Sequence, residues 1–546
     1  MDTTDQPRVV DPVLRARLAP SYIGANTDTL PSIGQVLRFS AALLAFIGVF
    51  VIAGRSEHPL VSMRLFEALV VPAAAAATAA FALYRPWQAL IAVLALTPVW
   101  DSAYISWQVG SVQVILQTIF VAALAVGAIT NRPTRGAFLW SETDLVAADR
   151  TKGFAAFRLA EVGVAGLAAM AIISTIASPN VQSSVTVLLH GILEPIGLAA
   201  VLVYLRPSRR DLVAVFMALG VAIGLGTALN IAQMLPTTTS LAAIQAQRLL
   251  FALASFGNVG VFAAIIASVL PLIVALTASR RSLPLPAWTT PVLIATIVAG
   301  LDGLFFALSK SAWIATSAST VLVLLLLVHS WRRRLAMILA AVALSTLIIP
   351  WPAFFLQIVP TANSAYRSVM VTLIGESRFD SWNPATLSGR GSLSERFYAA
   401  DAGVRMALAN PILGVGLDQF GPNYLKPTYR PPQAHLQLDH AHSFLPEVGA
   451  ELGIPAAVLV LVIYTAALWA MWRAYRGAKD QLTRIMAAGL ISSILAWLVV
   501  ATAFGCYIYR STNAQASDVV FSAVVVGAAI ALARTVHAER PWRPAR

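Results

Sequence analysis

The sequence predicts an all-α integral membrane protein, a polytopic helix bundle with one large, partly helical loop outside the membrane. Of its 546 residues, 58% are hydrophobic and only 12% are charged, against roughly 25% charged residues in soluble domains. Apolar runs long enough to span a bilayer, about 20 residues, recur along the chain. The basic residues gather at the ends of these runs, as in cytoplasmic membrane loops, so the net charge of +13 does not predict a nucleic-acid partner.

The apolar runs predict about 12 to 14 transmembrane helices. The third run is short and ends at Pro98, which is typical of a re-entrant segment. The predicted spans lie near residues 36–53, 66–83, 87–99, 112–129, 160–177, 185–205, 212–231, 259–276, 291–308, 312–328, 335–349, 454–472, 485–503 and 519–533.

The distribution of Lys and Arg predicts the orientation, because cytoplasmic loops carry the excess of basic residues. The basic clusters follow even-numbered spans, so both termini are expected in the cytoplasm. The clusters are Arg132 and Arg135; Arg206, Arg209 and Arg210; Arg280 and Arg281; Arg332, Arg333 and Arg334; Arg473, Arg476, Lys479 and Arg484; and Arg534 and Arg540.

This orientation predicts a domain organisation in five parts. These are a cytoplasmic tail (1–35), spans 1–11 (36–352), an outer loop (353–452), spans 12–14 (453–534) and a second cytoplasmic tail (535–546). The first apolar run is expected to be an uncleaved anchor, since no signal-peptide pattern precedes it. The single cysteine, Cys506, excludes an intrachain disulfide and a Cys-rich metal site.

The outer loop contains a predicted helix. Residues 392–395 match a capping box, and Pro411 disfavours helical geometry at Asn410. The helix carries Arg396 in its first turn, where a helix N-terminus attracts phosphate. Gly414 and Gly416 then form a turn that allows close backbone approach to a ligand. Phe397, Ala400, Val404 and Leu408 follow one another at helical spacing and predict one apolar face.

A polar run follows with His435, Asp439, His440 and His442. Three interpretations stay open for it: a metal site, a hydrogen-bonded polar loop, or an acid–base site. The spacing of the histidines fits no common structural zinc pattern, so we expect no metal and no cofactor. A histidine beside arginines suits proton abstraction from a hydroxyl.

The run from Ser394 to Ala456 resembles the O-antigen ligase / O-antigen polymerase superfamily of bacterial membrane glycosyltransferases. Residues 411–420 match its P-x-x-G-x-G-x-x-x-F segment. His442-Ser443, nine residues and Gly453 match its histidine motif, with Ala456 in place of the last glycine.

Two earlier segments extend the resemblance. Arg248 with residues 255–258 is similar to the arginine and F-x-N segment that opens a span in the family. Residues 308–313 are similar to the family's S-R-G-A-W segment, with Lys310 in place of arginine. Lysine is a point charge that lacks the bidentate fork of arginine.

The resemblance implies a GT-C-like fold and metal-independent transfer, with inversion, of a glycan from undecaprenyl diphosphate. The acceptor is a hydroxyl of a glycolipid or glycan at the periplasmic face of the bacterial inner membrane, in lipopolysaccharide and cell-envelope polysaccharide biosynthesis. Cations must then stabilise the leaving diphosphate. The candidates outside the membrane are Arg248 and Arg396, with Lys310 or Arg390 as helpers. His442 is the expected base, and His440 or Asp439 would orient it.

The sequence leaves several alternatives open. The acceptor can be another lipid-linked repeat unit, as in a polymerase, or a protein serine. A lipid-linked oligosaccharide flippase also has many spans, but the repeated halves common in transporters are not evident. A scaffold protein would not need Arg and His on one face. Three ionisable residues within predicted spans, His190, Glu194 and Asp302, are functional candidates, and an interhelical hydrogen bond is expected for the first two.

Overall fold

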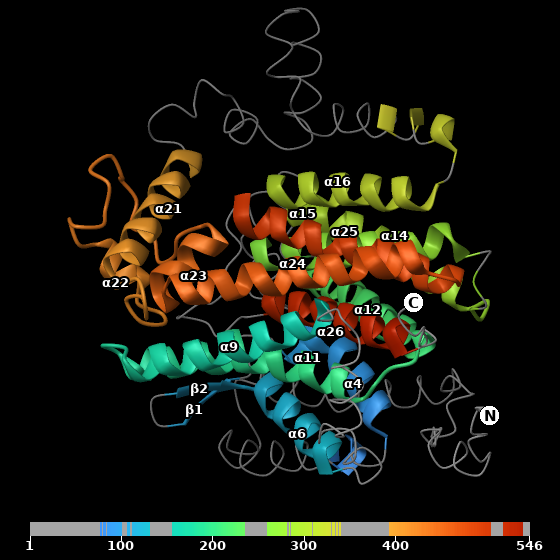
Figure 1. Ribbon diagram of the computed structural model, residues 1–546, viewed down its shortest axis with the longest axis horizontal. Helices are drawn as coiled ribbons and strands as arrows, with labels where there is room; N and C mark the ends of the chain where they lie inside the picture. Colours follow the sequence, from blue (N-terminus) through green and yellow to red (C-terminus); the bar gives the residue numbers. More distant parts are fainter. Residues whose placement is uncertain are drawn as a thin grey trace, which may run out of the picture. The chain divides into compact units, whose positions relative to one another are not determined.

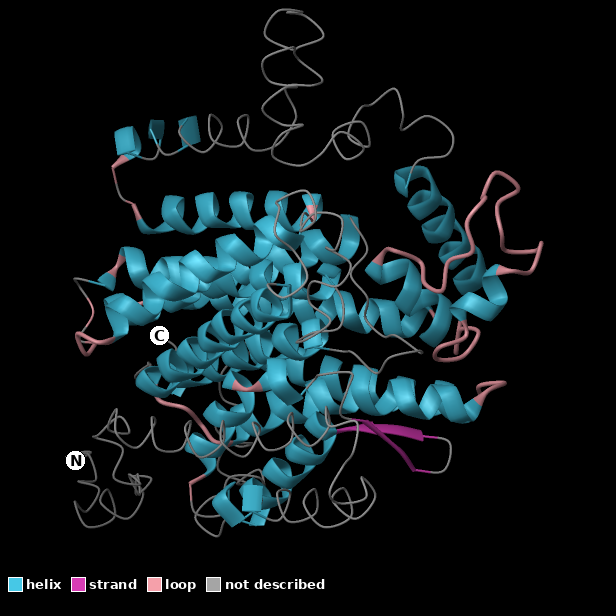
Figure 2. Cartoon of the chain, turned by 180° about the vertical axis from the view of Figure 1, so that it is seen from behind, coloured by secondary structure: helices cyan, strands magenta, loops and turns pink. Residues whose placement is uncertain are grey.

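The computed structural model describes residues 77–130, 156–234, 259–339, 392–503 and 517–538, with short gaps inside the first and third ranges. All of them belong to one compact unit, Val70–Arg546. Helices make up nearly all of the described structure (Figure 2). The elements are α4 (Pro86–Ala95), α5 (Thr97–Trp100), β1 (Ser106–Val109), β2 (Val112–Ile115), α6 (Leu116–Thr130), α9 (Ala156–Ile176), α10 (Val181–Val187), the π-helix η2 (Leu188–Leu193), α11 (Glu194–Tyr204), α12 (Arg209–Met234), α14 (Val259–Ala278), α15 (Thr289–Ala307), α16 (Lys310–Leu327), α21 (Ser392–Ala409), α22 (Phe420–Tyr424), α23 (Phe444–Leu452), α24 (Ile454–Gly477), α25 (Gln481–Ala503) and α26 (Ser517–Ala538).

Within the described residues, 7 helices are long and apolar enough to cross a membrane. They are α9, the continuous run Val181–Tyr204, α12, α14, α24, α25 and α26. Each one coincides with a predicted span. Shorter apolar helices are α4, α6, α15 and α16. The protein is therefore an all-α, multi-pass membrane protein, as the composition predicted. The predicted span near 36–53, and most of those near 66–83 and 335–349, lie outside the described residues.

One predicted span begins too early. Val112–Ile115 forms strand β2, which pairs antiparallel with β1, and helix α6 starts only at Leu116. The alternation of valine with Gln113 favours a strand. The high apolar content of the run 112–129 predicted a helix instead. A short hairpin therefore stands before the span.

Helix α14 forms the centre of the bundle (Figure 1). It contacts α25, α15, α16 and α26, and most of its side chains are buried. A helix that is apolar all round is expected to be covered on every side. The small residue Gly489 of α25 faces Leu272 of α14, where an added Cβ would meet a Leu272 side-chain atom at 2.5 Å. The close approach of these two helices therefore depends on glycine.

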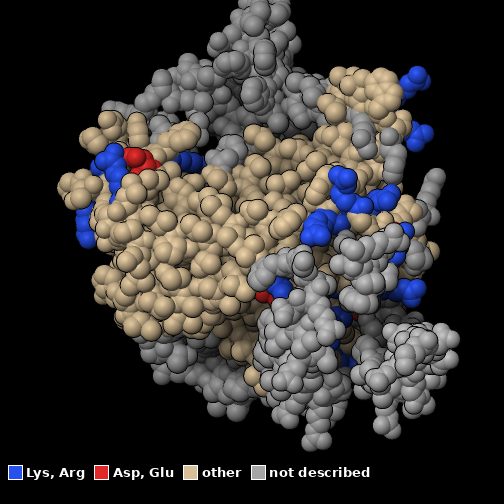
Figure 3. Space-filling view, viewed as in Figure 1, with Lys and Arg blue, Asp and Glu red and all other residues tan. Residues whose placement is uncertain are grey.

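The basic ends of several spans meet at one end of the bundle. Arg209 pairs with Asp480 at 3.4 Å, and the Tyr475 hydroxyl donates to the Leu326 carbonyl at 2.6 Å. The Thr535 hydroxyl lies 3.4 Å from the Pro207 carbonyl. Figure 3 shows uncharged side chains over a broad area between basic residues at either side of the view. Helix α24 separates this basic end from the outer-loop residues, which precede its first residue, Ile454.

Candidate functional site

The described part of the outer loop folds around a small core of its own. Helix α21 ends at Ala409, next to Asn410 and Pro411 as predicted, and packs against α23. An added Cβ on Gly403 would meet the Pro446 carbonyl oxygen at 3.0 Å, so the two segments are in close contact. The buried members of the core are Ala399, Ala402, Met406, Phe420, Tyr424, Ala434, Ala441 and Ala450.

The apolar face predicted for α21 is not the face that packs against the core of the loop. Its large apolar residues Phe397, Val404 and Leu408 are exposed, while Ala399, Ala402 and Met406 are buried. Small side chains allow α21 to approach α23 closely, and larger ones would hold the helices apart. The periodicity predicted this apolar face, but it did not predict which face of α21 packs against α23.

Glu395 fixes the start of the histidine-bearing run to α21. Its carboxylate is buried and accepts hydrogen bonds from the backbone amides of His435, at 3.0 and 3.2 Å, and Leu436, at 3.1 Å. This is not the capping role that the sequence predicted. A buried carboxylate needs such donors, because an unpaired buried charge is costly. Glu395 precedes Arg396, so it ties the helix that carries the candidate cation to the loop that carries the candidate base.

We expect Glu395→Ala to loosen residues 435–440. A hydrogen bond to a charged group contributes about 1.5–3 kcal/mol, and two amides lose their acceptor. Hydrogen exchange at residues 435 and 436 is expected to accelerate at least tenfold. The matched control is Asp401→Ala on the same helix, which removes an exposed ion pair with Arg405 of a kind that contributes about 0–1 kcal/mol. Equal exchange rates in the two variants would contradict this role of Glu395.

The glycine-rich turn is packed against the membrane helices. The Val415 amide donates to the Ala450 carbonyl at 2.7 Å. Ser174 of α9 shares its hydroxyl between the carbonyls of Leu413, at 3.1 Å, and Glu451, at 2.9 Å. Two serines of α10 hold the end of the turn: Ser183 donates to the Asp418 carboxylate and Ser184 to the Leu417 carbonyl. The turn therefore joins the outer loop to two spans.

Gly414 and Gly416 have a structural reason to be glycine. Both have positive φ, +69° and +105°. An added Cβ would lie 2.3 Å from the Glu451 carbonyl carbon at Gly414, and 2.9 Å from the Ser178 Oγ atom at Gly416. The close approach of these protein atoms is enough to explain why both positions are glycine, and no bound ligand is needed for that explanation. A role for them in substrate binding stays a prediction.

Glu451 lies under this turn, and its side chain accepts a hydrogen bond from the Phe420 amide at 3.0 Å. Burial raises the pKa of Glu451 from its ordinary 4.5 to about 8, and the charge of Asp418 adds to the rise. The backbone amides at residues 418–420 oppose it. Burial therefore favours the protonated form of Glu451.

The free energy of unfolding is expected to fall as the pH rises from about 5 to 8. In this window the folded protein retains the Glu451 proton and the unfolded chain has lost it, so stability falls with pH. The total effect is on the order of a few kcal/mol, since one pKa unit corresponds to about 1.4 kcal/mol. Unfolding temperature measured against pH in nanodiscs tests this. Glu451→Gln is expected to flatten the dependence, and an unchanged slope in that variant would contradict it.

His440 and His442 are in direct contact. The Nε2 atom of His440 lies 3.1 Å from Nδ1 of His442, and the ring centroids are 3.9 Å apart. His440 is buried and His442 is half-buried. The backbone of His442 has φ +52°, an uncommon conformation for a non-glycine residue. Such outliers cluster at functional sites.

The residues that follow His442 fix its position on the bundle. The Ser443 hydroxyl donates to the Thr502 carbonyl of α25 at 3.0 Å. The Phe444 ring packs edge-on against Trp497 of α25, with centroids 4.8 Å apart, and Trp497 stacks on Tyr464 of α24 at 5.0 Å. The two residues after the histidine are therefore held by α25, which itself packs on α24, and these contacts restrict the movement of His442.

The other predicted site residues fall into three groups. Arg396 is half-buried near the start of α21. Asp439 is exposed, and its Cα atom lies close to Gly421. Lys310 is the first residue of α16 and follows closely on α15, which ends at Ala307. Arg248 and Arg390 lie outside the described residues. The structure thus brings His440 together with His442 and places Arg396 on the helix next to their loop.

Sequence reasoning missed the supporting residues Glu395, Glu451 and Ser443. Glu451 and Ser443 lie within the histidine motif, and Glu395 lies next to Arg396. Their closeness in sequence to predicted site residues was the only signal that could have identified them. The hydrogen-bond partner of Glu451 lies 31 positions away along the chain, that of Ser443 lies 59 positions away, and that of Glu395 lies 40 positions away.

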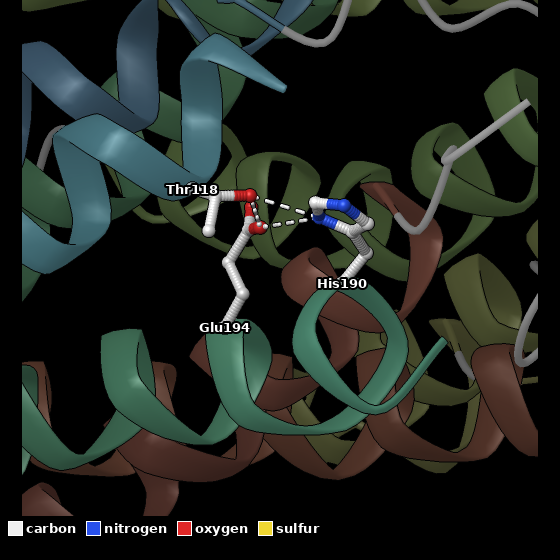
Figure 4. A network of polar contacts seen from close by, with 3 residues as sticks. All are labelled: Thr118, His190 and Glu194. Atoms are coloured by element: carbon white, nitrogen blue, oxygen red, sulfur yellow. Dashed lines mark hydrogen bonds and ion pairs between the residues drawn. The ribbon is translucent and has the colours of Figure 1, made fainter. Parts of the chain in front are cut away.

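A second polar cluster lies between α6 and the continuous run of η2 and α11 (Figure 4). The Thr118 hydroxyl of α6 donates to the Glu194 carboxylate at 2.9 Å and lies 2.8 Å from Nδ1 of His190. His190 and Glu194 are buried, and the π-helix η2 carries His190. The expected interhelical hydrogen bond is therefore confirmed, with Thr118 as the partner. Asp302 lies half-buried in α15.

The fold and the site define a multi-pass membrane protein whose outer loop presents a histidine pair anchored on two spans. Residues 294–461 match the family model of the O-antigen ligase. This match supports the resemblance to the O-antigen ligase/polymerase superfamily that the motifs indicated. The matched range contains Lys310, Arg396 and His442, and it excludes Arg248. No curated protein matches the chain.

Proposed function

We propose that this protein is a membrane glycosyltransferase. It transfers a glycan from an undecaprenyl-diphosphate-linked donor to an acceptor hydroxyl at the outer face of the bacterial inner membrane. The observation that carries the proposal is the contact between His440 and His442, within the matched O-antigen ligase range.

This contact suggests how His442 would act as a base. An imidazole accepts a proton at its unprotonated nitrogen. If Nδ1–H of His442 donates to Nε2 of His440, the lone pair of His442 lies on Nε2, which takes the proton of the acceptor hydroxyl. His440 then orients the ring and favours the imidazolium that forms, as a second group commonly does for a catalytic histidine.

The diphosphate leaving group requires positive charge. Arg396 lies at the start of α21, where the helix N-terminus adds its own partial positive charge. Arginine can bind a phosphate through two hydrogen bonds. We assign Arg396 and Arg248 to the diphosphate, with Lys310 and Arg390 as further cations, and we expect the reaction to proceed without a metal. Asp439, Gly414 and Gly416 are proposed to contact the substrate.

The orientation of the bundle supports an active site outside the cell. The basic ends of the spans meet at the end of α24 that is opposite to the outer loop. Their contacts are made by Arg209, Tyr475 and Thr535. Because basic residues mark the cytoplasmic side, we propose that the histidine pair faces the periplasm. The lipid-linked donor would be presented there.

The test uses purified protein in nanodiscs with undecaprenyl-diphosphate oligosaccharide and candidate acceptors, and it identifies products by mass. Transfer to a separate glycolipid is expected for a ligase, and lengthening of the lipid-linked donor for a polymerase. A serine peptide serves as the third acceptor. Translocation of the donor without transfer would overturn the proposal in favour of a flippase. Loss of transfer on adding a chelator would revive the metal interpretation of the histidine cluster.

A further inference from the structure

Helix α21 presents an apolar stripe on the side opposite to its core contacts. Phe397, Val404 and Leu408 are 67%, 44% and 68% exposed, and Ile412 directly after the helix is 69% exposed. Positions 397, 404 and 408 are seven and four residues apart, which places them within about 40° of one another around a helix of 3.6 residues per turn, so the first three share one face. Large contiguous apolar patches on a protein surface mark sites of interaction.

The end of α21 is joined to the outer ends of two spans. The Ile454 amide, at the first residue of α24, donates to the Pro411 carbonyl at 2.9 Å. Ser174, in the last turn of α9, lies 3.1 Å from the Leu413 carbonyl. Residues 411–413 are therefore at the level where α9 and α24 end. Both helices are long and apolar enough to cross a membrane, so we assign this level to the boundary between hydrocarbon and headgroups.

The course of α21 keeps the stripe close to this level. The helix packs on α23, which leads through Gly453 directly into α24. Figure 1 shows α21 running at a slant to α9 and α24, so it does not continue either span. Its polar flank carries the Asp401–Arg405 ion pair, at 2.9 Å and exposed. An apolar stripe beside a charged flank is the pattern of a helix lying in the membrane interface.

We propose that α21 is an interfacial helix and that the lipid bilayer covers its stripe. Phe397, Val404, Leu408 and Ile412 lie among the upper acyl chains, and Asp401 and Arg405 lie among the headgroups. The bilayer is chosen over a soluble partner because the hydrogen bonds of residues 411–413 to two spans place the end of the stripe at the membrane boundary. This inference does not depend on the glycosyltransferase activity.

The test measures the depth of single spin labels in the full-length protein. In a Cys506→Ser background, labels are placed by Val404→Cys and Leu408→Cys on the stripe, and by Gln433→Cys and Gln437→Cys as controls. Both glutamines are exposed and lie in the loop that follows α22. The protein is reconstituted in nanodiscs of phosphatidylethanolamine and phosphatidylglycerol. Collision rates with oxygen and with a water-soluble nickel chelate are recorded for each label.

At the two stripe positions, collisions with oxygen are expected to exceed those with nickel several-fold, and at the control positions the order is expected to reverse. Similar nickel access at all four positions would overturn the proposal. Protection of the stripe from both reagents would also overturn it, because a protein surface would then cover α21. Gel filtration of each variant before reconstitution confirms that the protein is folded, so a misfolded label site is replaced by Phe397→Cys on the same stripe.

Discussion

Replacing His442 by alanine is expected to reduce glycan transfer by about 10²–10⁴-fold, the range typical of a lost general base. The side chain stands half-buried beside His440, on a backbone with φ +52°. Its loss removes the proposed proton acceptor, and its neighbours Ser443 and Phe444 keep their contacts with α25. The stability of the fold should therefore change little. Initial rates of product formation, measured by mass at saturating donor, test this expectation.

His435→Ala is the matched control in the same loop. Its side chain is exposed, and its contact with Glu395 is made by the backbone amide, so transfer should stay close to the wild-type rate. His440→Ala should have an intermediate effect, because it removes the proposed orienting partner and leaves the base. Its pH–rate profile should shift as well. If His442→Ala transfers glycan as fast as His435→Ala does, the assignment of the base is wrong.

Replacing Gly453 by alanine is expected to disrupt the join between the outer loop and α24. Gly453 has φ +87° and ψ +167°, a region that only glycine visits without strain of about 1–3 kcal/mol. An added Cβ would also lie 2.2 Å from the Ile412 carbonyl oxygen and 2.5 Å from its carbon. These are backbone atoms, so the turn at residues 411–413 would have to move. We expect a large fall in unfolding temperature or no folded protein, measured by thermal unfolding in detergent.

Gly224→Ala in α12 is the matched control. An added Cβ there meets no atom within 4 Å, and alanine is a better helix former than glycine by about 1 kcal/mol. Its unfolding temperature should be unchanged or higher. A Gly453→Ala protein as stable as Gly224→Ala would show that the turn moves without cost, and the structural account of Gly453 would then be incorrect.

The helical architecture could be predicted from sequence because it depends on local chemistry. Apolar runs of span length become helices in a bilayer, where every backbone amide must find a partner within its own segment. The spans that begin at Ile454 and Val259 were predicted in this way. The hairpin at β1 and β2 was missed because its short alternating pattern lies beside a longer apolar run, whose signal dominates.

The candidate site was predicted only in part. The position of His442 within its motif was readable, since Ser443, Gly453 and Pro411 stand at fixed distances along the chain. The contacts that support it join residues far apart in sequence, such as Ser443 with Thr502 and Ser183 with Asp418. No local pattern encodes such pairs. Predicting them requires the packing of α21, α23 and α25.

The sequence by itself determined the membrane class, the helical spans and the identity of the polar outer loop, because hydrophobicity and the spacing of Pro, Gly and His act locally. Only the tertiary structure decided which face of α21 is buried, that Glu395 and Glu451 are internal carboxylates, and that the glycine-rich turn is joined to α9 and α10. The reason is that close packing selects small side chains at contacts between helices. Large apolar residues such as Phe397 and Leu408 are then left on the outer face of α21, and this placement led to the proposal that the bilayer covers them.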